Sequence, residues 1–104
     1  MLNQVIIVGR FVSKPTFKET ENGKKRCKVT VAVPRSFKNA EGEFETDFID
    51  VILWDAIAEN TSEYCNKGDI VGIKGRLQTT NKRMEVIAEK VTFLSSKSSD
   101  EEDE

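Results

Sequence analysis

Residues 46–54, with the sequence TDFIDVILW, constrain the fold more strongly than any other segment of the chain. The segment is rich in β-branched and aromatic residues, which favour a β-strand, and the side chains of a strand alternate between two faces. One face of this strand is wholly aliphatic and needs only a core to pack against: Ile49, Val51 and Leu53. The sequence therefore predicts a strand in the wall of a hydrophobic core.

The other face of the same strand mixes aromatic and charged side chains. Phe48 and Trp54 lie on it with Asp50 between them. Because burying an unpaired carboxylate is costly, we expect this face to lie outside the deep core. The two rings would stand about 20 Å apart along the strand. An exposed aromatic row is a surface on which nucleic-acid bases stack; a second layer or a subunit that covers the face is the alternative.

Length and composition predict one domain without a membrane span. At 104 residues the chain is long enough for a self-supporting core. Charged residues make up 33% of it, and its longest aliphatic run covers only residues 5–8, so neither a membrane span nor a secretory leader is expected. We therefore expect a cytoplasmic protein in which Cys27 and Cys65 are reduced and partly buried.

Histidine is absent from the chain. Its absence removes imidazole acid–base chemistry, Ser–His and Cys–His nucleophile pairs, and zinc sites built from Cys and His. The glycines at positions 9, 72 and 75 do not form a phosphate-binding loop. The sequence thus favours a binding module over an enzyme, with no catalytic residues, no metal site and no cofactor.

The net charge of −2 conceals an uneven distribution. All 16 basic residues lie within residues 1–99 together with 13 of the 18 acidic ones, so this part carries +3 and residues 100–104 carry −5. The body of the chain is therefore mildly basic, which is compatible with a polyanionic partner. Residues 95–104 are low in apolar content and are predicted to form a short, disordered acidic tail.

Five strands are expected in all. The four besides 46–54 are 3–11, 25–33, 69–77 and 84–94. Pro34 is expected to end the second strand or to mark an edge of it, because proline cannot donate a hydrogen bond to a sheet. Residues 35–45 are predicted to form a long hairpin with its tip at residues 39–42, and a short turn at residues 80–82 joins the last two strands.

A helix is expected to begin at Asp55, as its N-cap, and to run through Cys65. Its apolar stripe would hold Ile57, Tyr64 and Cys65, and Gly68 would supply the left-handed stop. Three strands, a helix and two further strands predict an all-β fold. The expected architecture is a five-stranded OB-fold Greek-key barrel with one helix between the third and fourth strands.

Four segments carry a family resemblance in the right order: LNQVIIVGR, AEGEFETDFIDVILW, AEN with SEYCNKGD, and IVGIKGRLQT. Across residues 1–94 the chain resembles bacterial and phage single-stranded DNA-binding proteins. The resemblance implies an OB-fold domain over these residues, assembled as a homo-oligomer that is a tetramer or, as in some relatives, a dimer. It also implies sequence-tolerant binding and protection of single-stranded DNA in replication, recombination or repair, in a host or a phage.

The resemblance assigns base stacking to three positions: Phe37, Phe48 and Trp54. The first two stand where many family members have Trp, and the third where others have Phe. Stacking of a base on such a ring contributes about 1–3 kcal/mol. Basic residues near these segments are candidate phosphate contacts: Arg10, Arg35, Lys38, Lys74, Arg76, Lys82 and Arg83.

The chain departs from the family pattern in two places. Residues 78–84 are a stub where relatives have a long hairpin with a further aromatic, so we expect a smaller footprint per subunit. The acidic tail is short and lacks the apolar tip that docks partner proteins in relatives, so the usual recruitment of replication and repair proteins is not implied.

Two other functions remain open. The chain also resembles relatives that act as protein-interaction adaptors in replication-restart complexes and bind nucleic acid as a secondary activity. The short last hairpin is compatible with this alternative. An RNA-binding OB domain is the third possibility, because base stacking does not depend on the sugar.

Overall fold

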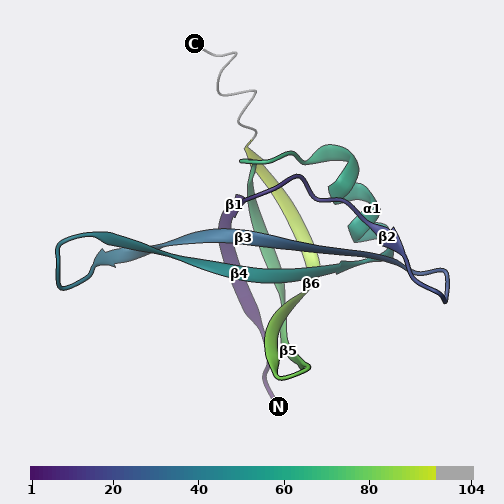
Figure 1. Ribbon diagram of the computed structural model, residues 1–104, viewed down its shortest axis with the longest axis horizontal. Helices are drawn as coiled ribbons and strands as arrows, with labels where there is room; N and C mark the ends of the chain where they lie inside the picture. Colours follow the sequence, from purple (N-terminus) through teal and green to yellow (C-terminus); the bar gives the residue numbers. More distant parts are fainter. Residues whose placement is uncertain (96–104) are drawn as a thin grey trace, which may run out of the picture.

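The strands form where β-branched and aromatic residues are concentrated, and one helix interrupts them. Figure 1 shows the computed structural model, which describes residues 1–95. The elements are β1 (Val5–Phe11), β2 (Lys18–Glu19), β3 (Lys25–Lys38), β4 (Phe44–Trp54), α1 (Asp55–Tyr64), β5 (Ile70–Thr80) and β6 (Arg83–Ser95). The predicted tail at 95–104 lies outside the described residues except for Ser95, which ends β6.

The five long strands close into a barrel. The sheet has the order β1-β5-β6-β4-β3-β2, and a further pairing of β1 with β3 joins its ends. All pairings are antiparallel except β4 with β6, which is parallel. Helix α1 lies between β4 and β5, the third and fourth of the long strands, which confirms the predicted OB-fold. The two-residue strand β2 pairs with the start of β3 and forms a short hairpin with it at the edge of the sheet.

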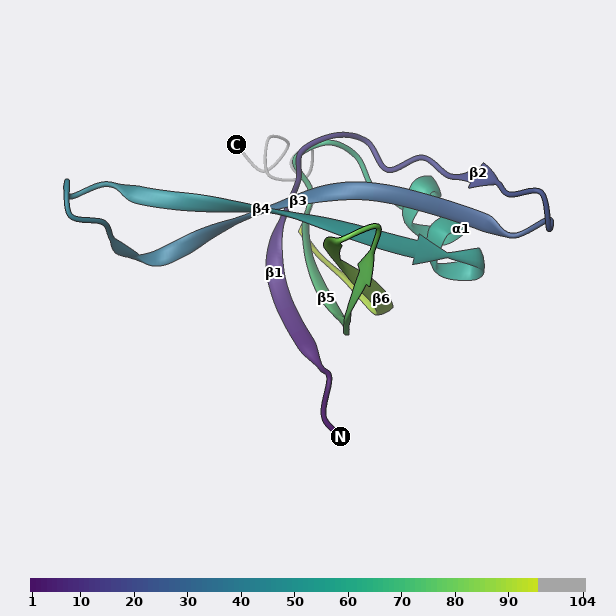
Figure 2. The same ribbon diagram turned by 60° about the horizontal axis from the view of Figure 1, so that its bottom comes forward.

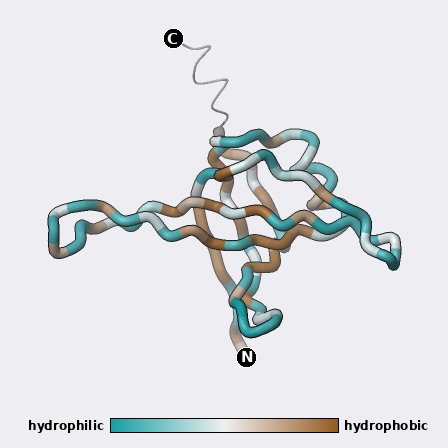
Figure 3. Tube along the Cα trace, viewed as in Figure 1, coloured by the Kyte–Doolittle hydropathy of each residue, from teal (hydrophilic) through white to brown (hydrophobic). Residues whose placement is uncertain are grey.

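The core is built from the inward rows of the strands, as the alternation predicted. Cys27, Val29 and Val31 of β3 are buried, and they pair in register with Leu53, Val51 and Ile49 of β4. Apolar segments gather where the strands cross the barrel, whereas the hairpin tips are hydrophilic (Figure 3). Cys27 and Cys65 are both buried free thiols, and burial raises the pKa of each, that of Cys65 to about 11.

Strand β3 does not end at Pro34 as predicted. It continues to Lys38, and its pairing with β4 is irregular between Pro34 and Lys38. A bulge of this kind tolerates proline, because the missing backbone N–H falls where the ladder is interrupted. The continued pairing carries β3 and β4 beyond the barrel as a long arm, which projects from it in both Figure 1 and Figure 2. Here "the arm" means residues 35–47.

The predicted N-cap of the helix is wrong. Trp54 precedes the helix without a side-chain capping bond, and Asp55 is already the first helical residue. The backbone of Asp55 is left-handed, with φ of 52°, and its carboxylate accepts a hydrogen bond from the N–H of Lys25 at 3.2 Å. The aspartate therefore fastens the helix start to β3, and the strand passes into the helix without a linker.

The buried stripe of the helix also differs from the prediction. Ala58 and Thr61 are its buried residues, and with Cys65 they follow the three- and four-residue spacing of one helical face. Ile57 is half-buried, but Tyr64 is exposed. The small residues allow the helix to approach the barrel closely, and their low hydrophobicity explains why the sequence pattern did not reveal this face.

The helix ends at Cys65 in an extended conformation rather than at a glycine. The ammonium group of Lys14 donates to the carbonyl oxygens of Ser62 and Cys65, at 3.0 and 2.9 Å, and thus satisfies helix-terminal acceptors. Gly68 has the expected left-handed backbone, with φ of 91°, but it shapes the following turn and donates its N–H to the carbonyl of Phe11.

Two glycines lie where backbones approach most closely. A Cβ on Gly9 would stand 2.4 Å from the carbonyl oxygen of Ala32, where β1 crosses β3. A Cβ on Gly75 would stand 2.1 Å from the carbonyl oxygen of Ile87, at the irregular pairing of β5 with β6. Closure of the barrel therefore depends on the absence of a side chain at both positions.

Replacing Gly75 with Ala is expected to lower the free energy of unfolding by about 1–3 kcal/mol, because the added methyl overlaps a backbone carbonyl. Gly72→Ala is the matched control in the same strand: its Cβ would meet nothing closer than 3.6 Å, so we expect no loss of stability. Urea titrations at one fixed protein concentration measure both variants. Equal unfolding midpoints for the two would contradict the prediction.

Candidate nucleic-acid interface

The outer surface of the β3–β4 pair carries the mixed row that the sequence predicted. Phe48 is 67% exposed, and Trp54 is half-buried at the end of β4. Ile52 lies between them but is only 1% exposed, so the row is not uniformly open. Within the described residues, no layer covers Phe48, which leaves its ring free to meet a planar ligand.

Asp50, the carboxylate within this row, has a partner on the neighbouring strand. Thr30 pairs with it in register and donates its hydroxyl to the carboxylate at 3.1 Å. The half-buried carboxylate is therefore satisfied by a cross-strand hydrogen bond, which offsets part of its desolvation cost. This contact accounts for a charged residue on an otherwise aromatic and aliphatic row.

Basic side chains surround the Trp54 end of the row, and sequence reasoning did not select them. Arg26 is the register partner of Trp54, with its guanidinium 5.9 Å from the ring centroid. Lys28 is the next outward residue of β3, and its ammonium lies 3.9 Å from the buried carboxylate of Glu85. Arg26 and Lys28 also line a pocket with Lys18. Working out the register of β3 against β4 from the sequence would have placed Arg26 and Lys28 beside Trp54.

The arm carries two further exposed aromatics. Phe37, a predicted stacking residue, is 70% exposed near the end of β3. Phe44, which the sequence analysis did not select, is 60% exposed at the start of β4. The ammonium of Lys38 lies 5.7 Å from the ring centroid of Phe44, and the two residues pair in register. The sequence offered one signal for Phe44: it lies on the same alternating row of β4 as Phe48.

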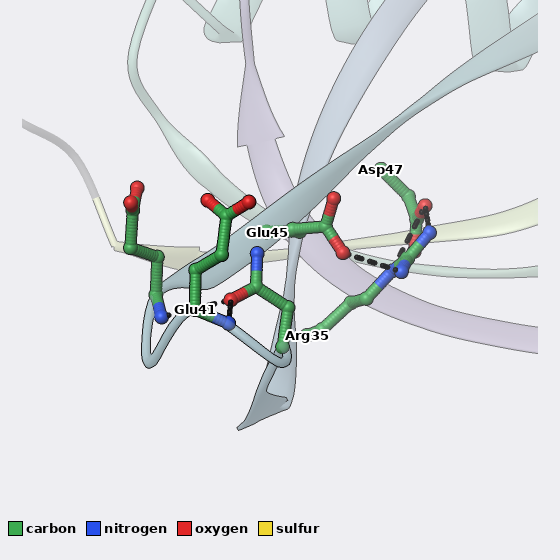
Figure 4. Close-up of polar contacts among 6 residues, drawn as sticks. Arg35, Glu41, Glu45 and Asp47 are labelled. Atoms are coloured by element: carbon green, nitrogen blue, oxygen red, sulfur yellow. Dashed lines mark hydrogen bonds and ion pairs between the residues drawn. The ribbon is translucent and has the colours of Figure 1, made fainter.

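Arg35 does not present a free cation for phosphate. Its guanidinium donates to Asp47 at 2.9 and 3.1 Å and to Glu45 at 3.1 Å, as Figure 4 shows. The hydrogen bond from Arg35 lowers the pKa of the Asp47 carboxyl and raises that of the guanidinium. A phosphate would have to displace two carboxylates from Arg35, so its geometry favours a role in holding the arm.

The remaining predicted phosphate contacts are spread over the barrel. Arg10 pairs with Ala32, which in turn pairs with Phe48, so the strands bring Arg10 to the aromatic row; its guanidinium also donates to the carbonyl of Gly68 at 3.1 Å. The others lie on β5, on β6 and in the turn between them: Lys74, Arg76, Lys82 and Arg83. Among the predicted cations, Lys38 lies beside an exposed ring, that of Phe44, and Arg10 lies on the same row as Phe48.

Asn81 and Lys82 form a two-residue turn between β5 and β6. Both have left-handed backbones, with φ of 52° and 66°, and the strands pair up to Thr80 and Arg83. The hairpin between the last two strands is thus as short as the sequence analysis expected. Within residues 1–95, no group of His, Cys, Asp and Glu side chains is arranged to hold a metal ion. Over the same residues, no helix has the length and apolar character needed to cross a membrane.

A closed OB-fold barrel with exposed aromatics and cations on its outer strands is a fold class that binds oligonucleotides and oligosaccharides. Residues 2–94 match the family described as the single-strand binding protein family. The chain belongs to this family.

Known relatives agree with this assignment. The chain is 43% identical over 106 residues to single-stranded DNA-binding protein B of Bacillus subtilis (strain 168), covering 93% of this chain and 94% of that protein. It is 45% identical over 103 residues to a single-stranded DNA-binding protein of Bacillus cereus, covering 90% and 61%.

Solved structures extend the agreement to the fold. The crystal structure of the single-stranded DNA-binding protein from Thermus aquaticus superposes with a TM-score of 0.74 at 29% identity, over 90% of this chain and 41% of that one. A domain of the same type from Synechococcus sp. gives a TM-score of 0.73 at 19% identity, over 88% and 96%, and supports the fold alone.

Replacing Arg35 with Gln is expected to raise the pKa of the Asp47 carboxyl towards its ordinary value of 3.8, because the hydrogen bond and the positive charge are both lost. NMR titration of the side-chain carboxyl measures this shift. Lys25→Gln, at the opposite end of β3, is the control and should leave the titration of Asp47 unchanged.

The same ion pair has a defined pH dependence. Because the folded pKa of Asp47 lies below the unfolded one, its contribution to stability is present above the unfolded pKa and is lost as the pH falls through the folded value. An Asp47 titration that is identical with and without Arg35 would contradict the assigned ion pair.

Proposed function

We propose that this protein binds single-stranded DNA without strong sequence preference and protects it during replication, recombination or repair. The observation that carries the proposal is the exposed Phe48 ring on an open outer strand, in a chain of the single-strand binding protein family. Bases stack on Phe48 and Trp54, and phosphates meet the cations beside them. The relatives named above bear the name of this activity.

The binding surface runs along the β3–β4 pair. Phe37, Phe48 and Trp54 act as stacking positions, and Arg10 and Lys38 are the predicted cations best placed to accompany them. Arg26 and Lys28, which the structure adds, supply positive charge at the Trp54 end. The other predicted cations lie on β5, on β6 and in their turn, where they would engage DNA only as it continues around the barrel: Lys74, Arg76, Lys82 and Arg83.

We further propose that the protein acts in the cytoplasm as a homo-oligomer, with a tetramer as the expected state. Exposed Ile6 and Val8 on β1 support a subunit contact. In the described part of the chain, residues 5–9 of β1 pair only with β5, so the other edge of this segment is open to a second strand. Residues 1–94 are proposed as the DNA-binding domain.

Oligo-dT is expected to quench the fluorescence of Trp54, the only tryptophan of the chain, because a base stacks against its ring. The logarithm of the affinity should fall linearly with the logarithm of the salt concentration, by about 0.7 per neutralised phosphate. A fluorescence titration at several salt concentrations measures both, and light scattering on the same samples gives the oligomeric state. Absence of oligo-dT binding at low salt would overturn the proposed function. Tighter binding of an RNA oligomer of matched length and sequence would assign the protein to RNA instead of DNA.

Phe37→Ala combined with Phe48→Ala is expected to weaken oligo-dT binding by at least about 1–3 kcal/mol, the contribution of one stacked base. Tyr64→Ala is the control, because Tyr64 is equally exposed but lies on the helix, away from the aromatic row. Titrations of the three proteins with the same oligonucleotide make the comparison. Binding by the double variant that matches the parent would exclude stacking as the source of affinity.

A further inference from the structure

The aromatic row of β4 does not stop at the edge of the barrel. Phe44 lies four residues before Phe48 in the same strand, so the alternation of β4 places both rings on one row, although the pairing with β3 is irregular between Phe44 and Thr46. The two rings are about 13 Å apart along the strand. Only Thr46 lies between them on this row, and it carries no charge. The surface suited to bases thus extends along the arm towards its tip.

Phe44 also has a cation beside it. Lys38 faces it from β3, with its ammonium 5.7 Å from the ring centroid, while the ring stays 60% exposed. An aromatic ring with an adjacent ammonium presents a stacking surface and a phosphate contact at the same point. Trp54 has the same arrangement with Arg26 of β3, whose guanidinium lies 5.9 Å from its ring centroid. Arg10 lies on the same row as Phe48 but two strands away.

The opposite face of the arm has the opposite character. Glu45 and Asp47 occupy the alternate positions of β4, and both are bound to Arg35 (Figure 4). At the tip, the side-chain oxygen of Asn39 accepts hydrogen bonds from the N–H groups of Glu41 and Glu43, which orders the turn. Carboxylates would repel phosphates on that face, which favours a path for the nucleic acid along Phe44 and Phe48.

We propose that Phe44, paired with Lys38, is a further base-stacking position that extends the path of single-stranded DNA along one face of the arm. Arg35 is the positioning residue that holds the acidic face together and thereby presents the aromatic face. This inference rests on the proposed function, and it lengthens the stacking row from about 20 Å, between Trp54 and Phe48, to about 33 Å.

A single-tryptophan reporter tests where the DNA lies. In the Trp54→Phe background, Phe44→Trp places the only indole on the arm, and oligo-dT is expected to quench it. Tyr64→Trp in the same background is the matched control, and its indole should not be quenched. No quenching of the arm reporter, under conditions where that variant binds oligo-dT by anisotropy, would overturn the proposal.

A length series tests what the contact contributes. Phe44→Ala is expected to weaken binding of long oligonucleotides by at least about fivefold, with little effect on the shortest ones that still bind, across a series of about 4–16 nucleotides. Lys38→Gln should reduce the salt dependence for the long oligonucleotides only. A uniform loss at all lengths, or no loss at any length, would contradict an added position on the path.

Two further readouts separate the stacking role of Phe44 from a role in subunit contact and from the proposed function itself. A drop in the mass of Phe44→Ala by light scattering would assign Phe44 to a subunit contact and overturn the proposal. If the parent protein binds oligo-dT while Phe44→Ala binds equally well at every length, the proposed function stands and the arm position fails. If the parent does not bind, the proposed function itself fails.

Discussion

The antiparallel pairing of β3 with β4 is the interaction on which the rest of the structure depends. Because successive side chains of a strand point in opposite directions, this single register sends Val29 and Val51 into the core and Phe48 out of it. β6 then joins β4 at Val51 and Ile52, and β1 joins β3 at its Arg10–Phe11 end, which closes the barrel. A shift of one residue would exchange the core row with the outward aromatic row.

Most of the fold could be predicted from the sequence, because the strands alternate clearly and occur in an order that few barrels share. What could not be predicted depended on pairing across the chain. Pro34 does not end β3: it still pairs with Thr46, and the irregular pairing of the bulge follows it. Asp55 does not cap the helix, because the N–H of Lys25, thirty residues away, binds its carboxylate. Local propensity contains no information about either partner.

In the candidate site too, some residues could be predicted from the sequence, whereas others depend on contacts across the chain. Phe48 and Phe37 could be identified from the sequence as aromatics on an exposed strand and its hairpin, and both are exposed. Arg35 was predicted from its charge alone, and its two carboxylate partners become evident only once the arm is folded. Phe44 was not selected, although it alternates with Phe48 along β4, and its contact with Lys38 becomes evident only once the arm is folded.

The left-handed backbone of Asp55 has a consequence for the ring that precedes it. A non-glycine residue in this conformation costs roughly 1 kcal/mol, and here it lets β4 turn into α1 between two consecutive residues. Trp54 therefore stands directly where β4 passes into α1, with no loop between the two elements. If bases stack on Trp54 as proposed, no loop has to be ordered at this end of the row, which reduces the entropic cost of binding.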